Sequence, residues 1–220
     1  MKHWVRDRGL LLANLGLFVV FFVGMVISGV QVYNSDQLEH GQAAVSLAGY
    51  LTSGDFVEST FENWESEFLQ MGMYVVLTAF LFQRGSSESK PIEEPSPQDE
   101  DPRDVADQPD VPGPVRRGGV ILKVYENSLS IMFFALFALS FLMHAIGGAS
   151  AYSDQEILHG GQAVGVWAYI GTSQFWFESM QNWQSEFLAI AVMVAASVYL
   201  RQRGSAESKP VAAPHHVTGT

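Results

Sequence analysis

The sequence predicts an all-α, polytopic membrane protein with four transmembrane helices, arranged as two parallel two-helix repeats. Three observations lead to this prediction: apolar blocks alternate with polar segments, the two halves of the chain resemble each other, and the basic residues are confined to a few segments. Apolar residue types make up 48% of the 220 residues and charged types 16%, against roughly 25% charged residues in an average soluble domain. This composition favours a lipid environment over a uniform globule in water.

The composition also excludes several classes of function. The chain has no cysteine, which excludes disulfides, zinc ribbons, iron–sulfur clusters and thiol nucleophiles. Its net charge of -11 argues against a nucleic-acid partner, because a nucleic-acid-binding surface is basic. No phosphate-binding loop, dinucleotide fingerprint, nucleophile elbow or paired-histidine zinc motif is present. We therefore expect no cofactor and no enzymatic activity.

The first long apolar block, residues 10–30, is interrupted only by Asn14, Ser28 and glycines. As a helix it would be about 30 Å long, which matches the hydrocarbon thickness of a bilayer. Basic residues precede it, as they do in a signal peptide, but the apolar run is too long for one. A similar block recurs at residues 129–149, where no signal peptide can lie. We interpret both blocks as retained membrane spans.

Two shorter apolar blocks, residues 68–82 and 187–200, are predicted to be the other two spans. Each is too short to cross the bilayer by itself. In the first half, however, a helix can begin near Asp55, with Glu58 as a capping partner, and continue to Phe82. Its predicted end is Arg84-Gly85, a cation followed by a C-cap glycine. The resulting helix of about 28 residues is longer than the bilayer is thick, which explains how a helix with a short apolar block can cross the membrane.

The chain aligns with itself at an offset of 119 residues, with about a third of the aligned positions identical. Residues 61–69 match residues 180–188, and residues 83–91 match residues 202–210. We therefore divide the chain into four segments, listed here in order: a first two-span repeat at 1–91, a disordered, acidic, proline-rich linker at 92–119, a second two-span repeat at 120–210, and a disordered tail at 211–220.

The basic residues predict the orientation in the membrane. All 12 Lys and Arg lie outside residues 9–83 and 124–200, so neither loop between spans contains one. By the positive-inside rule, the termini and the linker face the cytoplasm and the two loops face outward. Within these loops, residues 43–51 and 163–170 are moderately apolar and are predicted to form short interfacial helices.

A candidate polar site follows from residues that are identical in the two halves. Asn63 and Glu67 share a helix face near the outer end of a short span, and the second half repeats this arrangement. Such carboxylates, amides and imidazoles could bind a divalent cation or relay protons. Alternatively, they cap or cross-link helices at the interface. The six candidate residues are Asn63, Glu67, Asn182, Glu186, His40 and His159.

Acidic residues that differ between the halves are expected to form a solvated face. Asp55, Glu58, Glu62 and Glu65 correspond to Gln174, Phe177, Gln181 and Gln184. His144 is the one ionisable residue of the second long span, and its partner position in the first half is Met25. Because no matching histidine is present there, haem bound between two histidines is not expected.

Each repeat ends in Arg-Gly-Ser-x-Glu-Ser-Lys-Pro. The positive-inside rule and helix capping explain the arginine and the glycine of this motif. They do not explain why the remaining residues are identical in the two copies. We expect a cytoplasmic docking surface, within the protein or for a partner. Its candidate residues are Arg84, Glu88, Lys90, Arg203, Glu207 and Lys209.

The motifs Phe-Glu-Asn-Trp-x-Ser-Glu-Phe-Leu-Gln, Tyr-Asn…His-Gly-Gln and Arg-Gly-Ser-x-Glu-Ser-Lys resemble those of a family of small bacterial membrane proteins classed as a domain of unknown function. The resemblance covers nearly the whole chain outside the linker. It implies a multi-pass protein of the bacterial inner membrane, and it implies no activity or site residues.

Three hypotheses of function follow. The leading one is a non-enzymatic accessory or scaffold subunit, which associates with itself or with another membrane protein in the bilayer. The alternative is a transporter or channel for protons or divalent cations, with its site between the two repeats on the outer side. A membrane enzyme with an outer-face metal is the third and least favoured.

Overall fold

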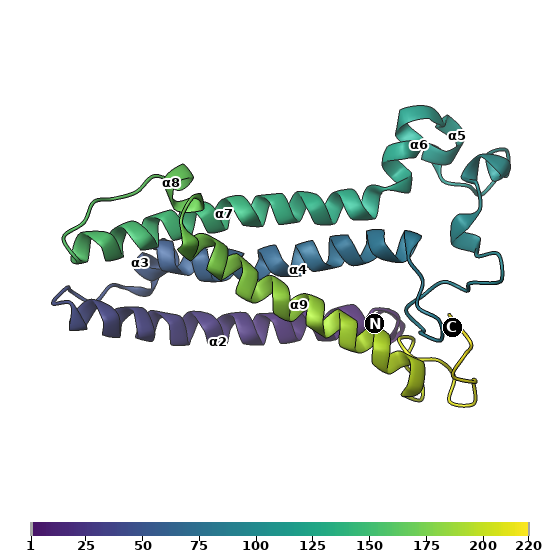
Figure 1. Cartoon of the computed structure of the whole chain (residues 1–220), viewed down its shortest axis with the longest axis horizontal. Coiled ribbons are helices and arrows are strands. Elements are labelled where there is room, and N and C mark those ends of the chain that lie inside the picture. Colours follow the sequence, from purple (N-terminus) through teal and green to yellow (C-terminus); the bar gives the residue numbers. More distant parts are fainter. Residues whose placement is uncertain (1, 220) are drawn as a thin grey trace. The chain divides into compact units, whose positions relative to one another are not determined.

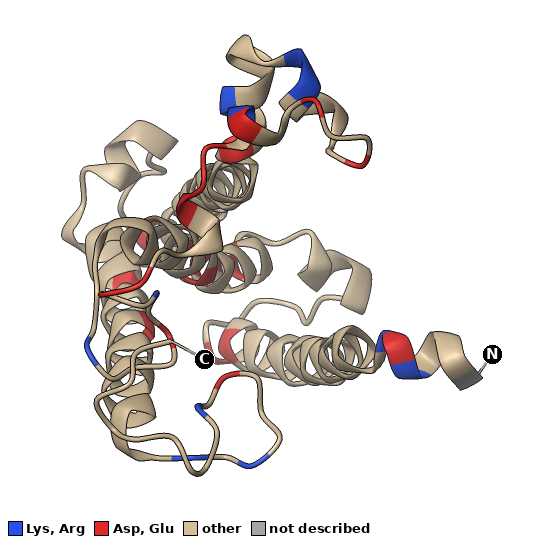
Figure 2. Cartoon of the chain, turned by 90° about the vertical axis from the view of Figure 1, so that its right-hand side faces the viewer, with Lys and Arg blue, Asp and Glu red and all other residues tan. Residues whose placement is uncertain are grey.

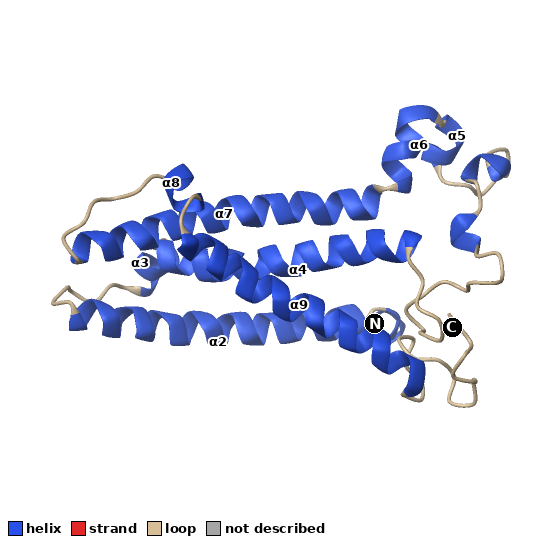
Figure 3. Cartoon of the chain, in the orientation of Figure 1, coloured by secondary structure: helices blue, strands red, loops and turns tan. Residues whose placement is uncertain are grey.

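The computed structural model describes residues 2–219, and within this range every regular element is a helix (Figure 3). The predicted all-α class is confirmed. The chain forms two compact units, and both are built from segments of the two halves. Unit 1 comprises the chain up to residue 60 together with residues 143–175, and unit 2 comprises residues 61–142 and those from 176 onward.

Unit 1 contains α1 (Lys2–Asp7), α2 (Gly9–Glu39), α3 (Leu47–Leu51) and α8 (Val166–Ile170) (Figure 1). It also contains the first turns of α4 (Gly54–Phe80) and α9 (Ser173–Tyr199), and the second half of α7 (Ser128–Leu158). The remainder of these three long helices belongs to unit 2.

Two helices, α2 and α7, are long and apolar enough to cross a membrane. They contain the two long blocks that the sequence identified as spans. No residue of α2 is buried, although leucine, valine and phenylalanine side chains cover most of its surface. The helices α4 and α9 have 27 residues each, close to the length predicted for the helix that contains a short block. Their crossing of the membrane remains a prediction.

Short helices, α3 and α8, form within residues 43–51 and 163–170, as the sequence predicted, whereas their place at the membrane interface remains a prediction. The ring of Tyr50 on α3 lies so close to Gly29 on α2 that a Cβ there would be 2.8 Å from the ring carbon Cζ. Tyr169 on α8 lies in the same way against Gly148 on α7, at 2.7 Å. Both tyrosines are buried. These glycines thus provide the space that docks each short helix.

A polar tether reinforces the docking in both halves. The amide of Asn34 exchanges two hydrogen bonds with the backbone of Val45, of 2.7 and 3.1 Å. At the positions 119 residues later, the hydroxyl of Ser153 makes two such bonds with Val164, of 2.9 and 3.2 Å. Different side chains therefore satisfy the same backbone groups, and the loop conformation is the same.

The ends of α4 differ from the prediction. The hydroxyl of Ser53 accepts a hydrogen bond from the Phe56 N–H, so Ser53, and not Asp55, caps the start of the helix. At the other end α4 stops at Phe80, before the predicted Arg84-Gly85. The reason is that Gln83 and Ser86 are joined in a turn, which removes these residues from the helix.

Unit 2 also contains the segment between the repeats, where the structure describes short helices: η1 (Pro97–Asp99), η2 (Pro102–Val105), α5 (Gly113–Arg117) and α6 (Gly119–Glu126). Whether this acidic segment is disordered in solution remains a prediction. Figure 2 colours the ribbon by charge: blue segments mark the positions of Lys and Arg, which lie on α1, α5, α6 and the loops, outside the long apolar helices.

Candidate functional site

The start of α4 crosses α7 at very short range, and small residues make this possible. A Cβ at Gly54 would lie 2.6 Å from the Ala151 nitrogen and 2.7 Å from the Gly147 oxygen. A Cβ at Gly147 would in turn lie 2.8 Å from the Val57 side chain. Small residues at a crossing let two helix backbones approach closely. The crossing brings Glu58, the residue after Val57, against α7.

Tyr169 fixes the carboxylate of Glu58. Its phenol donates a hydrogen bond of 2.9 Å to Glu58 Oε1, across 111 residues of sequence. Tyr169 has no exposed surface, because Gly148 and Phe175 enclose its ring. A buried phenol requires a polar partner, and the carboxylate provides it.

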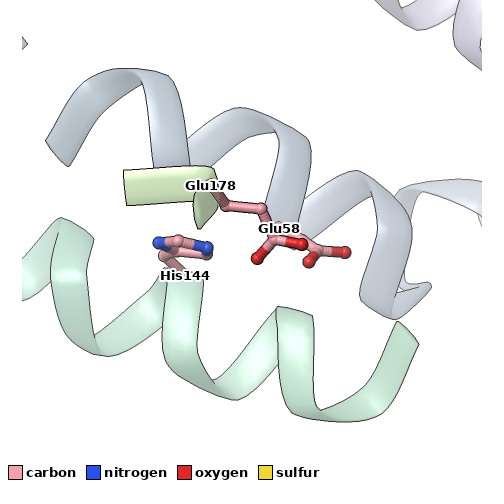
Figure 4. Close-up of side chains that lie close together, drawn as sticks. All are labelled: Glu58, His144 and Glu178. Atoms are coloured by element: carbon pink, nitrogen blue, oxygen red, sulfur yellow. The ribbon is translucent and has the colours of Figure 1, made fainter. Parts of the chain in front are cut away.

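His144 lies beside this pair, on α7 (Figure 4). Its imidazole is completely buried and stacks on Phe175, with ring centroids 4.8 Å apart. A carboxylate oxygen of Glu58 and a ring nitrogen of His144 lie within 4.8 Å of each other. Unit 1 thus contains a cluster of carboxylate, imidazole and phenol, named here the Glu58–His144–Tyr169 cluster.

Figure 4 also labels Glu178, which follows Phe175 by three residues on α9. Because α9 is one continuous helix from Ser173 to Tyr199, these two residues lie on the same helix face.

Asp55, three residues before Glu58 on α4, is half-buried and has acidic neighbours. Burial raises the pKa of Asp55 above its ordinary value, and the charges of Asp154 and Asp36 raise it further. No Lys or Arg occurs in residues 9–83 or 124–200.

His40 and His159, which the sequence singled out, end α2 and α7. Each Nδ1 forms a hydrogen bond with the backbone oxygen four residues earlier, Asp36 and Gln155 respectively, at 2.9 and 2.8 Å. The two rings lie near each other, with centroids 6.4 Å apart. Their identity in the two halves is thereby explained by a shared role at the helix end.

The other four candidates lie in unit 2. Asn63 and Glu67 are exposed on α4. The Asn182 amide donates to the Glu178 backbone oxygen at 3.2 Å, and the Glu186 backbone oxygen accepts from Gln70 at 2.8 Å. Burial raises the pKa of the Glu186 carboxyl, and the charge of Glu67 raises it further. The structure does not join these residues and the two histidines in one unit.

The expectation of a solvated face is wrong for Glu65. Its side chain has no exposed surface, and its Oε1 accepts a 2.9 Å hydrogen bond from the Trp183 indole. Glu58 is also part of a polar cluster, as described above. The sequence analysis missed these acids because it chose candidate residues by their identity in the two halves. Glu58, His144 and Glu65 do not repeat, because Phe177, Met25 and Gln184 occupy the equivalent positions.

The repeated Arg-Gly-Ser-x-Glu-Ser-Lys motif forms the same turn twice. In the first copy, the Ser89 hydroxyl accepts the Gln83 N–H at 3.1 Å, and the Ser86 hydroxyl accepts the Glu88 N–H at 3.1 Å. The second copy makes the equivalent bonds with Gln202, Ser208, Ser205 and Glu207. Gly85 and Gly204 both have positive φ, of 83° and 85°. Turn formation thus explains the repeated serines and glycines.

The charged members of this motif have separate roles in unit 2. Glu88 accepts a hydrogen bond from the Tyr74 phenol, and Lys90 forms an ion pair with Asp99. Arg84 forms an exposed ion pair with Glu93.

Lys209 is almost completely buried. Its ammonium group donates to the backbone oxygens of Gly85, His215 and Val217. The second turn and the C-terminal tail therefore dock on the first turn, which places docking within the protein. A docking role for Arg203 and Glu207 toward a partner remains a prediction.

A family model described as "Domain of unknown function (DUF6766)" matches residues 1–220. No curated protein and no solved structure matches the chain.

Proposed function

The chain belongs to the DUF6766 family, and from this premise we propose that it is a four-span protein of the bacterial inner membrane that serves as a non-enzymatic accessory or scaffold subunit. The termini lie in the cytoplasm and α3 and α8 lie at the outer interface. Residues 68–82 and 187–200 are the two short spans. The protein associates with itself or with another membrane protein.

The observation that carries this proposal is the exposure of α2. None of its 31 residues is buried, and its exposed side chains include Leu11, Phe18 and Phe21. A soluble monomer rarely exposes an apolar surface of this extent, because covering it releases roughly 25 cal/mol per Å². Lipid covers such a surface, and the part of α2 that α3 does not cover can also pack against a neighbouring membrane helix.

Membrane topology can be tested with single cysteines, because the natural chain contains none. We expect a membrane-impermeant maleimide to label Gln42→Cys and Gln162→Cys from outside intact cells. Gln98→Cys, in the central segment, should react only after permeabilisation and provides the matched control. Labelling of only one of the two loop cysteines, or labelling of Gln98→Cys in intact cells, would contradict the four-span arrangement.

The subunit role requires a separate test. A photo-crosslinking amino acid at Phe21 should form one defined adduct in native membranes, with a second copy or with one other membrane protein. The same group at Val217, in the C-terminal tail, is the control for nonspecific capture. If the Phe21 probe reacts only with lipid, the subunit role is wrong while the membrane location stands.

The second candidate function, movement of protons or divalent cations, is favoured by Glu186, whose pKa is raised by burial and raised further by the charge of Glu67. A carboxyl with a raised pKa binds a proton more readily. Reconstituted liposomes should then show proton or Mn²⁺ flux that the Glu67→Gln/Glu186→Gln double variant lacks. Flux equal to that of empty liposomes would exclude this function.

A further inference from the structure

Unit 2 contains a cavity of about 610 Å³ between the last turns of α4 and the chain that follows this helix (Figure 1). Four segments line it: α4, the first copy of the repeated motif, η1 and the end of the C-terminal tail. All of the lining residues belong to unit 2. Pockets that bind small molecules have volumes of about 300–1,000 Å³, so this cavity has the size of a binding site for one such molecule.

The lining combines an apolar surface with an oriented carboxylate. Val75 and Ala79 of α4 provide aliphatic surface, and Tyr74 provides an aromatic ring. The phenol of Tyr74 donates a 2.9 Å hydrogen bond to Glu88 Oε2, which fixes the orientation of the carboxylate. The Ser87 hydroxyl lies 3.5 Å from Glu88 Oε1, at the limit of a hydrogen bond. A carboxylate oxygen accepts about two hydrogen bonds, so Oε1 can accept a further donor.

The charges around the cavity favour a cation. Glu88 and Asp99 contribute two negative charges to the lining and Lys90 contributes one positive charge, so the lining has a net charge of -1. Residues 92–110, which begin beside the cavity, contain eight acidic residues and one basic residue. A negative field of this kind raises the local concentration of cations. The C-terminal end of α4 has the same effect, because the helix dipole is negative there.

An ammonium group already binds at this place. The ammonium of Lys90 donates to the Ala79 backbone oxygen at 3.1 Å and forms an ion pair with Oδ1 of Asp99. It also lies 5.7 Å from the centroid of the Phe82 ring. The end of α4 and η1 thus offer the acceptors that a primary ammonium group requires. Because Lys90 pairs with Asp99, Glu88 is the carboxylate that can receive the ammonium group of a ligand.

We propose that this cavity binds a small organic monocation, with its primary ammonium group on Glu88 and its apolar body against Val75 and Ala79. One positive charge balances the net charge of the lining, whereas an anion would meet two carboxylates. The inference goes beyond the accessory role and does not depend on it, because binding is measured on the purified protein.

The test measures how a ligand protects a single cysteine from a maleimide, since the natural chain contains no cysteine. Ser87→Cys places a thiol in the lining of the cavity. The matched control is Ala206→Cys, at the equivalent position of the second motif, which is exposed and lies outside the lining. In the full-length protein in detergent, phenethylamine should slow the labelling of Ser87→Cys several times and leave that of Ala206→Cys unchanged.

Two further probes isolate the charge of the ligand. Phenethyl alcohol and hydrocinnamate have the same phenylethyl body as phenethylamine, but their end groups are neutral and anionic. Both lack the charged donor that Glu88 would accept. We therefore expect each to require at least about a tenfold higher concentration than phenethylamine for half-maximal protection.

Variants of the two equivalent glutamates test the assigned carboxylate. In the Ser87→Cys background, Glu88→Gln should weaken protection by phenethylamine at least about tenfold, because the charged acceptor is lost. Glu207→Gln changes the equivalent residue of the second motif, which is exposed and outside the lining, and should leave protection unchanged. Tyr74→Phe keeps the carboxylate but removes the bond that orients it, and should weaken protection several times.

The proposal is overturned if phenethylamine protects neither cysteine or protects both equally. It is also overturned if phenethyl alcohol or hydrocinnamate protects as well as phenethylamine, or if Glu88→Gln leaves protection unchanged. If Glu88→Gln fails to fold, the comparison of the three probes on Ser87→Cys decides the question. None of these results bears on the crosslinking at Phe21, so failure of this inference is distinguishable from failure of the accessory role.

Discussion

The indole N–H of Trp183 donates a 2.9 Å hydrogen bond to the carboxylate of Glu65, which has no exposed surface. Phe137 and Trp176 pack edge-on around the same indole, at centroid distances of 6.1 and 6.5 Å. Within unit 2, a buried acid of α4 is thus held by an aromatic donor of α9.

Loss of this hydrogen bond should destabilise the protein. Trp183→Phe keeps the aromatic packing but removes the N–H, so we expect the free energy of unfolding to fall by about 1–3 kcal/mol. Thermal or denaturant unfolding in detergent measures this change. Gln184→Ala, at an exposed neighbouring position, is the control and should change it by less than about 0.5 kcal/mol. Equal effects of the two changes would show that the bond contributes nothing.

The space at Gly29 should be essential for docking of α3. Gly29→Val places side-chain atoms where the Tyr50 ring lies, and overpacking of this kind costs about 1–3 kcal/mol. We expect faster amide hydrogen exchange at Leu47–Leu51 in this variant. Gly24→Val on the same helix is the matched control, because its Cβ would meet no atom within 4 Å. If both variants exchange alike, the glycine contact does not hold α3.

Lys209 should hold the C-terminal tail in place. Lys209→Met removes the ammonium group that donates to Gly85, His215 and Val217, and leaves these oxygens without that donor. We expect carboxypeptidase to remove the tail several times faster from this variant. Lys90→Met is the control, since the Lys90 ammonium group donates to Ala79 and Asp99, which lie outside the tail. Tail removal at an unchanged rate would contradict the role of Lys209.

Asp55 should make stability depend on pH. Burial raises the pKa of Asp55 above 3.8, although a backbone hydrogen bond lowers it in part, and Asp154 and Asp36 raise it further. The folded state therefore binds this proton more tightly than the unfolded state does. The Asp55 carboxyl therefore makes its full contribution to the free energy of unfolding below pH 3.8. This contribution is lost as the pH rises through the pKa of the folded state.

The variant Asp55→Asn should consequently be more stable than the natural protein at pH 7 and no more stable near pH 3.5. Thermal unfolding at both pH values measures the difference. The control is Asp7→Asn, at an exposed position of α1, which should change the stability by the same small amount at both pH values. A stabilisation of Asp55→Asn that is equal at the two pH values would show that ionisation is not its cause.

The helical class, the two long apolar helices and the approximate extent of α4 and α9 could be read from the sequence alone. The reason is that these properties are local: the length of an apolar run sets a span, and composition within a few turns sets a helix. The offset of 119 residues also located two equivalent docking tyrosines, Tyr50 and Tyr169, although their role was not apparent.

Only the tertiary structure decided which acidic residues are buried. Helical periodicity places Glu58 and Glu65 on a face of α4, but it does not state which face meets another helix. Their partners, Tyr169 and Trp183, lie 111 and 118 residues away, and such pairs form only where packing brings separate helices into contact. Local sequence determined the helices of this protein, and packing between distant segments determined where its buried charges lie.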